Sequence, residues 1–371
     1  MKILYSCLSK SWGGMEMITI TSIKKLLERK CEITLICVKD SRIHIEANNL
    51  GIIIYPLSAS KFQYFVNIFI LNNLIKENKF DLIHTYASKD LWLIVPALKL
   101  IRSKIPLFLT KHVGSFIIKK DFLHKIIYKR VTKLFAISNI IKQNLLDTCP
   151  VDESKVILLH NGIDTNYYAP NEDKLIEGRK KWEIKKNELV IGMMGRFSPG
   201  KGHEEFLEAV VELNKRHDHL KFIVIGEASR GEDDFALRIR SLAEKNKINN
   251  LIFTGYLKDV RETLAALDIF IFPSHAEAFG LALAEAMAMG LPTVCSNSDG
   301  VLDIAVDNET SYLFENKNSK DLTEKIEFLI NSKDKRKSFG QKGRERIINN
   351  FNLDSKADMV VKIYGEHLNE S

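Results

Sequence analysis

The sequence predicts an α/β protein built from two doubly wound, Rossmann-like parallel-sheet domains that face one another. Short apolar runs rich in β-branched and aromatic residues recur along the 371 residues, and helix-length intervals separate them. The runs are nearly continuous rather than alternating, which is typical of parallel strands that helices cover on both faces. Because ligands bind beyond the carboxyl ends of such strands, the sequence predicts a cleft between the two domains.

The first predicted domain comprises residues 1–165 and the second residues 166–350. In the first domain strands are expected at 2–6, 32–38, 51–55, 81–84, 106–110, 133–137 and 155–159. In the second domain they are expected at 188–195, 221–226, 250–254, 268–272 and 292–296. The polar sequence between the domains indicates a linker with a short helix. Residues 351–371 have a helical pattern, and we expect them to pack back onto the first domain.

Cysteine usage and hydropathy indicate a protein of the reducing cytoplasm. The longest apolar run, residues 62–75, is shorter than the roughly 20 residues that a membrane span needs. The five cysteines are odd in number and form no CxxC pair, so the sequence predicts neither a disulfide framework nor a zinc site. They are Cys7, Cys31, Cys37, Cys149 and Cys295.

Two acidic residues stand in the otherwise apolar stretch HAEAFGLALAEAMAMG, residues 275–290. Glu277 is expected in the loop after a strand, and Glu285 in the second turn of the helix that follows Gly280. A carboxylate in apolar surroundings needs a partner or a ligand. Since a helix start offers free N–H groups and carboxylates accept hydrogen bonds from hydroxyls, this stretch suits a polyhydroxylated ligand.

A second candidate loop, GRFSPGKG, follows the strand that ends at Gly195. Arg196 and Lys201 lie on either side of its Ser-Pro-Gly turn, just before a helix. Two cations at a helix start can neutralise a diphosphate, although a solvated loop with two surface cations would have the same sequence. The loop matches neither GxxxxGK[ST] nor GxGxxG.

In the first domain, Gly13 and Gly14 stand between the first strand and a helix, where paired glycines allow a ligand phosphate to approach the backbone. A tight turn would explain them equally. His84, His112 and His160 lie near strand ends, where the cleft is expected. No two histidines are spaced as metal ligands and no DxD occurs, so no metal is expected.

Together these segments resemble the family-4 retaining glycosyltransferases of the GT-B fold, also called glycosyl transferases group 1, of the bacterial lipopolysaccharide or cell-surface glycan type. The resemblance rests on GRFSPGKG, the pair of glutamates separated by seven residues, HNGID at 160–164 and the two N-terminal glycines, and it extends over nearly the whole chain. It implies that Arg196 and Lys201 bind the diphosphate of a nucleotide-sugar donor. It also implies that Glu285 holds the donor ribose.

Further roles follow from the same resemblance. Glu277 and the N–H groups of Phe279, Gly280 and Leu281 are implied to contact the donor sugar. His112 is implied to lie beside the reacting carbon. The resemblance places Gly13 and Gly14 in a loop that closes over the phosphates, and Gly255 and Tyr256 in the region that holds the base. Arg196, Lys201, Glu277 and His112 are therefore the expected catalytic group.

The chain departs from the family pattern in two places. The segment after the second glutamate reads SDGVLDIA, with Asp299 and Asp303 where the family has a glycine-rich turn and a glutamate. Ser311 stands in TSYLF where TGYLF is usual. The first departure leaves the fold intact but bears on the donor pocket.

The implied activity is transfer of a hexose-type sugar, with retention, to a hydroxyl of a lipid-linked, lipopolysaccharide or surface-polysaccharide acceptor. No cofactor is implied. A GT-B-fold epimerase or phosphorylase and a non-catalytic sugar-nucleotide-binding protein remain as alternatives. The latter is disfavoured because a pure binder needs no cations to neutralise a leaving group.

A basic segment indicates a further partner. Residues 1–165 carry 24 Lys and Arg against 13 Asp and Glu, and residues 99–133 carry ten against one. Within Ser115–Lys133 the apolar and basic residues alternate in a helical sense, which is typical of an element at an anionic membrane surface. A core-packed helix with a solvated basic back is the alternative. Nucleic acid is not expected, because no recognised binding motif accompanies the charge.

Overall fold

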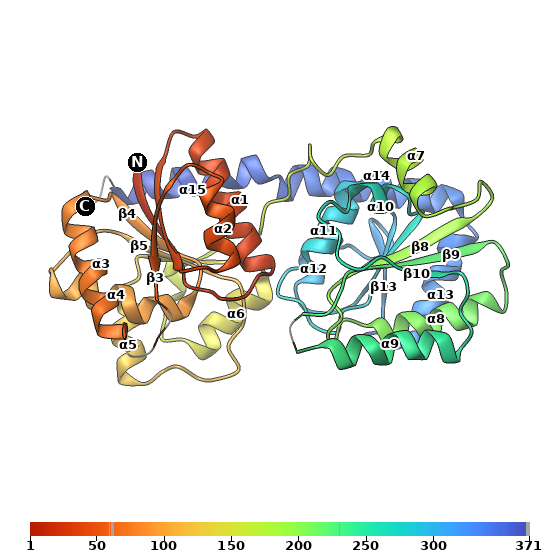
Figure 1. The fold of residues 1–371 in the computed structure, drawn as a ribbon, viewed down its shortest axis with the longest axis horizontal. Coiled ribbons are helices and arrows are strands. Elements are labelled where there is room, and N and C mark those ends of the chain that lie inside the picture. Colours follow the sequence, from red (N-terminus) through yellow and green to blue (C-terminus); the bar gives the residue numbers. More distant parts are fainter. Residues whose placement is uncertain (59, 61–62, 230, 369–371) are drawn as a thin grey trace. The chain divides into compact units, whose positions relative to one another are not determined.

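The computed structural model describes residues 1–58, 60, 63–229 and 231–368. The chain forms two compact units, and each contains one parallel sheet (Figure 1). The first unit comprises residues 1–162 and 354–371, and the second comprises residues 163–353. Residues 369–371, the end of the expected C-terminal helix, lie outside the described residues.

The first unit contains a seven-stranded sheet in the order β3-β2-β1-β4-β5-β6-β7. All of its strand pairs are parallel; β1, for example, pairs with β4 from Ile3 opposite Leu82 to Ser6 opposite Thr85. The strands are β1 (Lys2–Cys7), β2 (Glu32–Val38), β3 (Ile53–Leu57), β4 (Leu82–Thr85), β5 (Leu107–Lys111), β6 (Lys133–Ala136) and β7 (Val156–Leu158).

Helices cover this sheet. Ser41, Asp121 and Ser138 each accept a backbone N–H bond at the start of a helix, which explains why α2, α5 and α6 begin where they do. The helices are α1 (Gly14–Glu28), α2 (Arg42–Asn48), α3 (Tyr64–Asn78), α4 (Leu91–Leu100), α5 (Phe122–Lys129), α6 (Asn139–Thr148) and α15 (Leu353–Leu368), with short 3₁₀ turns η2 (Ser88–Asp90) and η3 (Glu153–Lys155).

The last helix, α15, completes the core of the first unit. Tyr364 is fully buried in a core cluster with side chains of α1, α2 and the strands. Its hydroxyl contacts the hydroxyl of Tyr5 and the ring nitrogen Nδ1 of His84. Next to this core, Arg29 at the end of α1 forms an ion pair with Asp358 of α15 at 2.6 Å. The chain therefore returns to the first unit at its end.

The second unit contains a six-stranded parallel sheet in the order β10-β9-β8-β11-β12-β13. Strand β13 was not among the expected strands. The strands are β8 (Leu189–Met194), β9 (Leu220–Ile225), β10 (Leu251–Phe253), β11 (Ile269–Phe272), β12 (Thr293–Ser296) and β13 (Ser311–Phe314). The helices are α7 (Glu172–Lys181), α8 (His203–Asn214), α9 (Asp233–Lys245), α10 (Arg261–Ala265), α11 (Leu281–Ala288), α12 (Val301–Ile304), α13 (Ser319–Ile330) and α14 (Lys333–Phe351).

The expected helix over Ser115–Lys133 is wrong in extent. Only Phe122–Lys129 is helical, because Asp121 caps α5 at its own position and residues 115–121 form an irregular segment. The apolar residues expected on one face also differ in burial: Ile127 is buried, whereas Phe116 and Phe122 are exposed. In the described part of the chain no helix is long and apolar enough to cross a membrane.

Candidate active site

Two loops of the second unit meet beyond the carboxyl ends of β8 and β11. The His275 N–H donates to the Gly200 carbonyl at 2.9 Å, which links the loop 195–202 to the loop 273–280. Gly202 has φ +75°, and a Cβ there would lie 2.1 Å from the Pro273 carbonyl oxygen. Only a glycine allows this approach, so the two sequence motifs are held together by their backbones.

Lys201 and Glu277 form an ion pair between these loops. The Lys201 side chain is 25% exposed and that of Glu277 17%. The structure therefore brings together a cation and a carboxylate that the sequence analysis assigned to the diphosphate and to the sugar. Both remain accessible to a ligand.

Arg196 lies at the end of β8 but contacts different residues. Its guanidinium donates to the Ser229 hydroxyl at 3.2 Å and lies 3.5 Å from Glu232, and its side chain is half exposed. Glu232 also accepts from the Ser198 hydroxyl. Glu232 and Ser229 were not among the predicted site residues, because they lie between β9 and α9 in a segment without a motif.

The start of α11 presents a row of N–H groups to the same loop. Gly280 caps the helix with φ +104°, and the N–H groups of the first turn have no acceptor within the helix. Phe279 is buried and Leu281 begins the helix. Gly300, from the segment SDGVLDIA, donates its N–H to the Glu277 carbonyl at 2.9 Å. The departure from the family pattern at this segment thus lies against the loop of Glu277.

Glu285 is partly buried on α11. Burial raises the pKa of Glu285 to about 7, and a hydrogen bond from the Tyr168 hydroxyl limits that rise. The neighbouring Tyr167 ring packs against the Arg261 guanidinium at 3.6 Å, and Arg261 pairs with Asp259 at 2.5 Å. Tyr167 and Tyr168 were not among the predicted site residues, because they lie in the polar linker sequence TNYY, which contains no motif.

A partly buried network of side chains supports the loop of Glu277. His275 Nε2 lies 2.8 Å from Glu205 Oε1, and Asn316 donates to the His275 carbonyl at 2.7 Å. The second carboxylate oxygen of Glu205 has no hydrogen-bond partner among the described residues. The network fixes His275, and with it the backbone that leads to Glu277.

Gly195, Gly226 and Gly255 lie together at the ends of β8, β9 and β10. A Cβ on Gly226 would lie 2.0 Å from the Gly195 carbonyl, and the Gly226 N–H donates to the Gly255 carbonyl at 3.2 Å. Tyr256, the next residue, is exposed. Gly255 and Tyr256 thus follow β10 at the same end of the sheet at which Arg196 follows β8.

In the first unit, Gly13 caps α1, and its N–H donates to the buried Glu16 at 3.0 Å. His112 follows β5 and is stacked on Tyr86 with ring centroids 5.3 Å apart. Burial lowers the pKa of His112 to about 3, and its Nε2 has no partner among the described residues. A neutral, buried histidine whose Nε2 has no partner among the described residues therefore lies at this strand end.

The other two histidines have different surroundings. His84 is buried and contacts the hydroxyls of Tyr364 and, at 2.8 Å, Thr110, which makes it part of the core. His160 lies just after β7. In the described part of the chain no group of three or more His, Cys, Asp and Glu side chains could hold a metal ion.

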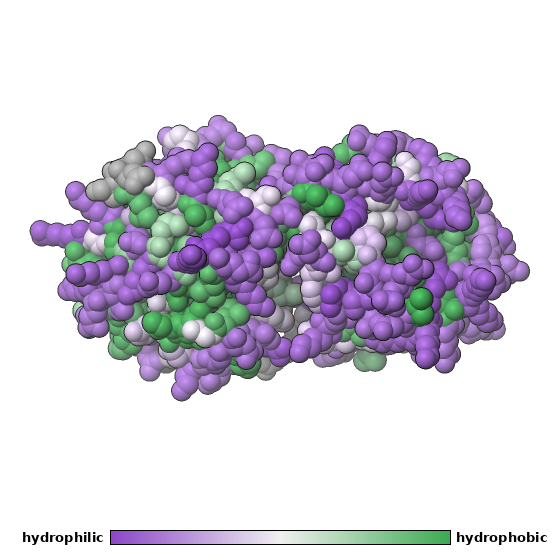
Figure 2. Space-filling view, turned by 90° about the horizontal axis from the view of Figure 1, so that it is seen from above, coloured by the Kyte–Doolittle hydropathy of each residue, from purple (hydrophilic) through white to green (hydrophobic). Residues whose placement is uncertain are grey.

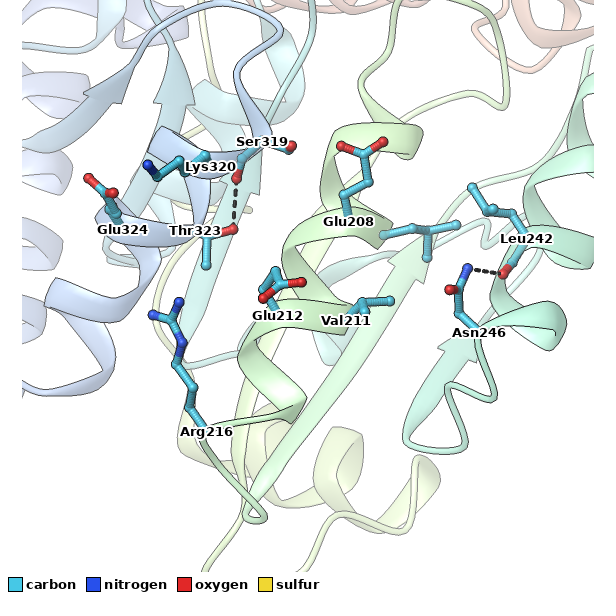
Figure 3. Close-up of a pocket in the computed structure, with 11 residues that line it drawn as sticks. Glu208, Val211, Glu212, Arg216, Leu242, Asn246, Ser319, Lys320, Thr323 and Glu324 are labelled. Atoms are coloured by element: carbon cyan, nitrogen blue, oxygen red, sulfur yellow. Dashed lines mark hydrogen bonds between the residues drawn. The ribbon is translucent and has the colours of Figure 1, made fainter.

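A pocket of about 520 Å³ lies elsewhere on the second unit, between α8, α13 and the end of α9 (Figure 3). Glu208 and Glu212 come from α8, and Lys320 and Glu324 come from α13. None of the predicted site residues lines it. It is a groove between helices, away from the strand ends.

Two family models match the chain, one in each half. Residues 12–167 match Glycosyltransferase Family 4, and residues 176–346 match Glycosyl transferases group 1. The protein therefore belongs to these glycosyltransferases, and the resemblance drawn from the motifs is confirmed.

Relatives and solved structures agree with this assignment. UDP-Gal:alpha-D-GlcNAc-diphosphoundecaprenol alpha-1,3-galactosyltransferase of Escherichia coli is 26% identical over 381 residues, which cover 98% of this chain and 96% of that protein. The capsular polysaccharide biosynthesis glycosyltransferase CapM of Staphylococcus aureus is 28% identical over 257 residues, 67% of this chain and 65% of that protein. A crystal structure of a glycosyltransferase from Rickettsia africae superposes with a TM-score of 0.91 at 27% identity and covers 100% of this chain and 99% of that one. The predicted GT-B fold is thereby confirmed.

Proposed function

We propose that the protein transfers a hexose-type sugar, with retention, from a nucleoside-diphosphate sugar to a hydroxyl of a lipid-linked or surface-polysaccharide acceptor. The observation that carries the proposal is the pairing of Lys201 with Glu277 beside the start of α11, the helix that bears the partly buried Glu285. A cation for phosphate and a carboxylate for sugar hydroxyls lie on two neighbouring loops, and the N–H groups for the sugar and a second carboxylate for a ribose diol lie on the helix that follows.

The proposed reaction breaks the bond between the sugar carbon and the diphosphate oxygen. Lys201, Arg196 and the helix start neutralise the charge that develops on the departing diphosphate, which is the electrostatic contribution expected to dominate. The acceptor oxygen forms the new bond on the same face, and its proton passes to the departing phosphate oxygen. Glu277 could act as a nucleophile, as paired carboxylates do in glycosidases. Its ion pair with Lys201 favours the role of holding sugar hydroxyls instead.

Nucleotide release measured across a panel of nucleotide sugars tests this proposal. A true donor should raise the melting temperature, because binding to the folded state alone stabilises it. Release that depends on acceptor supports transfer. Release or epimer formation without any acceptor would favour the epimerase or phosphorylase alternative, and thermal shift without turnover would favour a binding protein.

A lipid-linked acceptor at the cytoplasmic face of the membrane is part of the proposal. The Escherichia coli relative is named for a diphosphoundecaprenol acceptor. The first unit offers a surface suited to such a location, which we call the lysine-flanked apolar surface. It comprises the exposed side chains Phe65, Val66, Phe69 and Ile70 of α3 and Val113, Phe116, Ile117, Ile118, Phe122 and Leu123 around the start of α5.

The helices α3 and α5, which carry the two parts of this surface, both contact α4. The Tyr64 hydroxyl at the start of α3 donates to the Trp92 carbonyl at 2.5 Å, and His124 of α5 packs against the Trp92 ring at 5.1 Å. The helices α3, α4 and α5 accordingly lie together in the first unit (Figure 1). Figure 2 shows hydrophobic side chains gathered at the surface of this unit. The lysine-flanked apolar surface is thus wider than the segment Ser115–Lys133 alone.

Lysines accompany the apolar side chains. Lys120, Lys125 and Lys129 are exposed, and Phe116 is fully exposed. Apolar side chains beside lysines favour insertion into an anionic bilayer surface. Flotation with phosphatidylglycerol vesicles at low salt should carry the protein upward, and the Phe65→Ser/Phe69→Ser variant should float less. Flotation of wild type and variant to the same extent would leave α3 out of the contact, and absence of flotation would end the membrane proposal.

A further inference from the structure

Lys111, the last residue of β5, is a buried cation. It is 5% exposed, and it is the only Lys or Arg among the buried residues of the described chain. Strand β5 leads directly into His112 and then into the exposed segment that begins at Val113. Lys111 therefore lies at the carboxyl end of its strand, at the base of that segment.

The ammonium group of Lys111 has few partners. It donates to the Ser88 hydroxyl at 3.1 Å, and no carboxylate of the described residues lies within 4.0 Å of it. Burial lowers the pKa of Lys111, and the charge of Lys119 lowers it further. The fold thus leaves a buried ammonium group without a counter-ion among the described residues.

Other partly buried cations of the same unit are satisfied in a different way. Arg130 donates to the carbonyls of Ser103 and Ile105 at 3.1 and 2.6 Å. Lys155 donates to the carbonyls of Lys129 and Val131 at 3.2 and 2.8 Å. Each of these side chains has two backbone acceptors, whereas Lys111 has a single hydroxyl. A buried ammonium group without such acceptors is costly to keep charged.

We propose that Lys111, with Ser88, forms a binding site for a phosphate group. A phosphate would supply the missing negative charge and would accept hydrogen bonds from the amine and from the hydroxyl. Its place next to His112 and the exposed segment suits the diphosphate of a lipid-linked acceptor. That identification of the source rests on the proposed function, whereas the site itself does not.

Binding of inorganic pyrophosphate, measured by calorimetry on the full-length protein, tests the site. Lys111→Met keeps the length of the side chain without its charge and should weaken one class of pyrophosphate binding by about 10-fold or more. Lys24→Met, on the exposed face of α1, is the matched control and should leave binding unchanged. Unchanged pyrophosphate binding in Lys111→Met would overturn the proposal.

Two further arms separate the donor site and the source of the phosphate. Lys201→Ala should remove a different class of pyrophosphate binding, and the double variant should show the sum of both losses, because the sites share no partner. If Lys201→Ala has no effect, the proposed donor site is wrong, and the effect of Lys111→Met still decides whether the Lys111 site exists.

Loss of binding to geranyl diphosphate in Lys111→Met supports an acceptor diphosphate, and loss confined to phosphatidylglycerol vesicles supports a headgroup phosphate. Ser88→Ala, which should weaken binding less, replaces Lys111→Met if that variant does not fold.

Discussion

Lys201 and Glu277, 76 positions apart in sequence, form an ion pair between the loops that follow β8 and β11. Each residue holds the other in place before any ligand binds. A donor that places its phosphate on Lys201 and its sugar on Glu277 would then meet both groups already positioned. The pair is therefore both a structural contact of the second unit and the centre of the proposed site.

Lys201→Ala should lower the rate of sugar transfer by about 100- to 1000-fold, since one preorganised charge on a leaving group contributes on that order. Rates under saturating donor and a thermal melt would be measured together. Lys215→Ala, which removes an exposed lysine paired with Glu212, is the control. Full transfer activity in Lys201→Ala would remove the diphosphate role.

Glu285→Gln should change how stability depends on pH. The native carboxyl has a pKa of about 7 against an ordinary 4.5, so the native state keeps a proton that the unfolded chain has lost between those values. The stability that this proton supplies is complete below pH 4.5 and is lost as pH rises to 7, by about 3 kcal/mol at most. Urea unfolding of wild type against Glu285→Gln should show this loss in the wild type alone. The exposed Glu309→Gln should behave as wild type.

Tyr168→Phe should shift the pH profile of kcat/KM for the donor on its acid side. The Tyr168 hydroxyl lowers the pKa of Glu285, so its removal should raise that pKa further and move the acid limb of kcat/KM for the donor to higher pH. Tyr167→Phe keeps the Tyr168–Glu285 contact and should leave the limb in place. A fall in activity without any change in the pH profile would assign Tyr168 a purely structural role.

Gly202→Ala should destabilise the second unit and separate the two loops. The new Cβ would meet the Pro273 carbonyl at 2.1 Å, and the residue would keep a φ of +75°. Gly51→Ala, with φ +66° and nothing within 4 Å, carries the backbone strain without the clash. Thermal melts should therefore show a larger loss for Gly202→Ala, and equal losses would mean that the close approach contributes nothing.

Salt and charge should control vesicle binding. Replacing Lys120, Lys125 and Lys129 by Gln should weaken binding to phosphatidylglycerol vesicles by about 100-fold, at roughly 1 kcal/mol per lysine. The same change at Lys320, Lys333 and Lys337 of the second unit is the control. Wild-type binding should weaken as salt rises, because the Debye length shortens. If neither the lysine substitutions nor added salt weakens vesicle binding, that binding rests on the apolar side chains alone.

The strands of the first sheet, all strands of the second sheet except β13, and the segments that carry Arg196, Lys201, Glu277 and Glu285 could be predicted from the sequence, because apolar runs and the motifs at their ends are local signals. Contacts between distant segments could not. Glu232 lies 36 positions after Arg196, and Tyr168 lies far from Glu285, and neither is marked by a pattern. The amphipathic pattern of 115–133 overpredicted a helix, because periodicity does not register the cap at Asp121 or the exposure of Phe116. The roles assigned to the site residues stay predictions.

The burial of Tyr364 against Tyr5 and His84 affects the order in which the chain can fold during synthesis. The ribosome releases the first sheet early, but the helix that closes its core is made only after the entire second unit. The second unit can finish folding while its predecessor still exposes an apolar face. A chain that ends at residue 353, where the second unit is complete, should accordingly bind chaperones through its first unit. Removal of α15 from the finished protein should unfold the first unit.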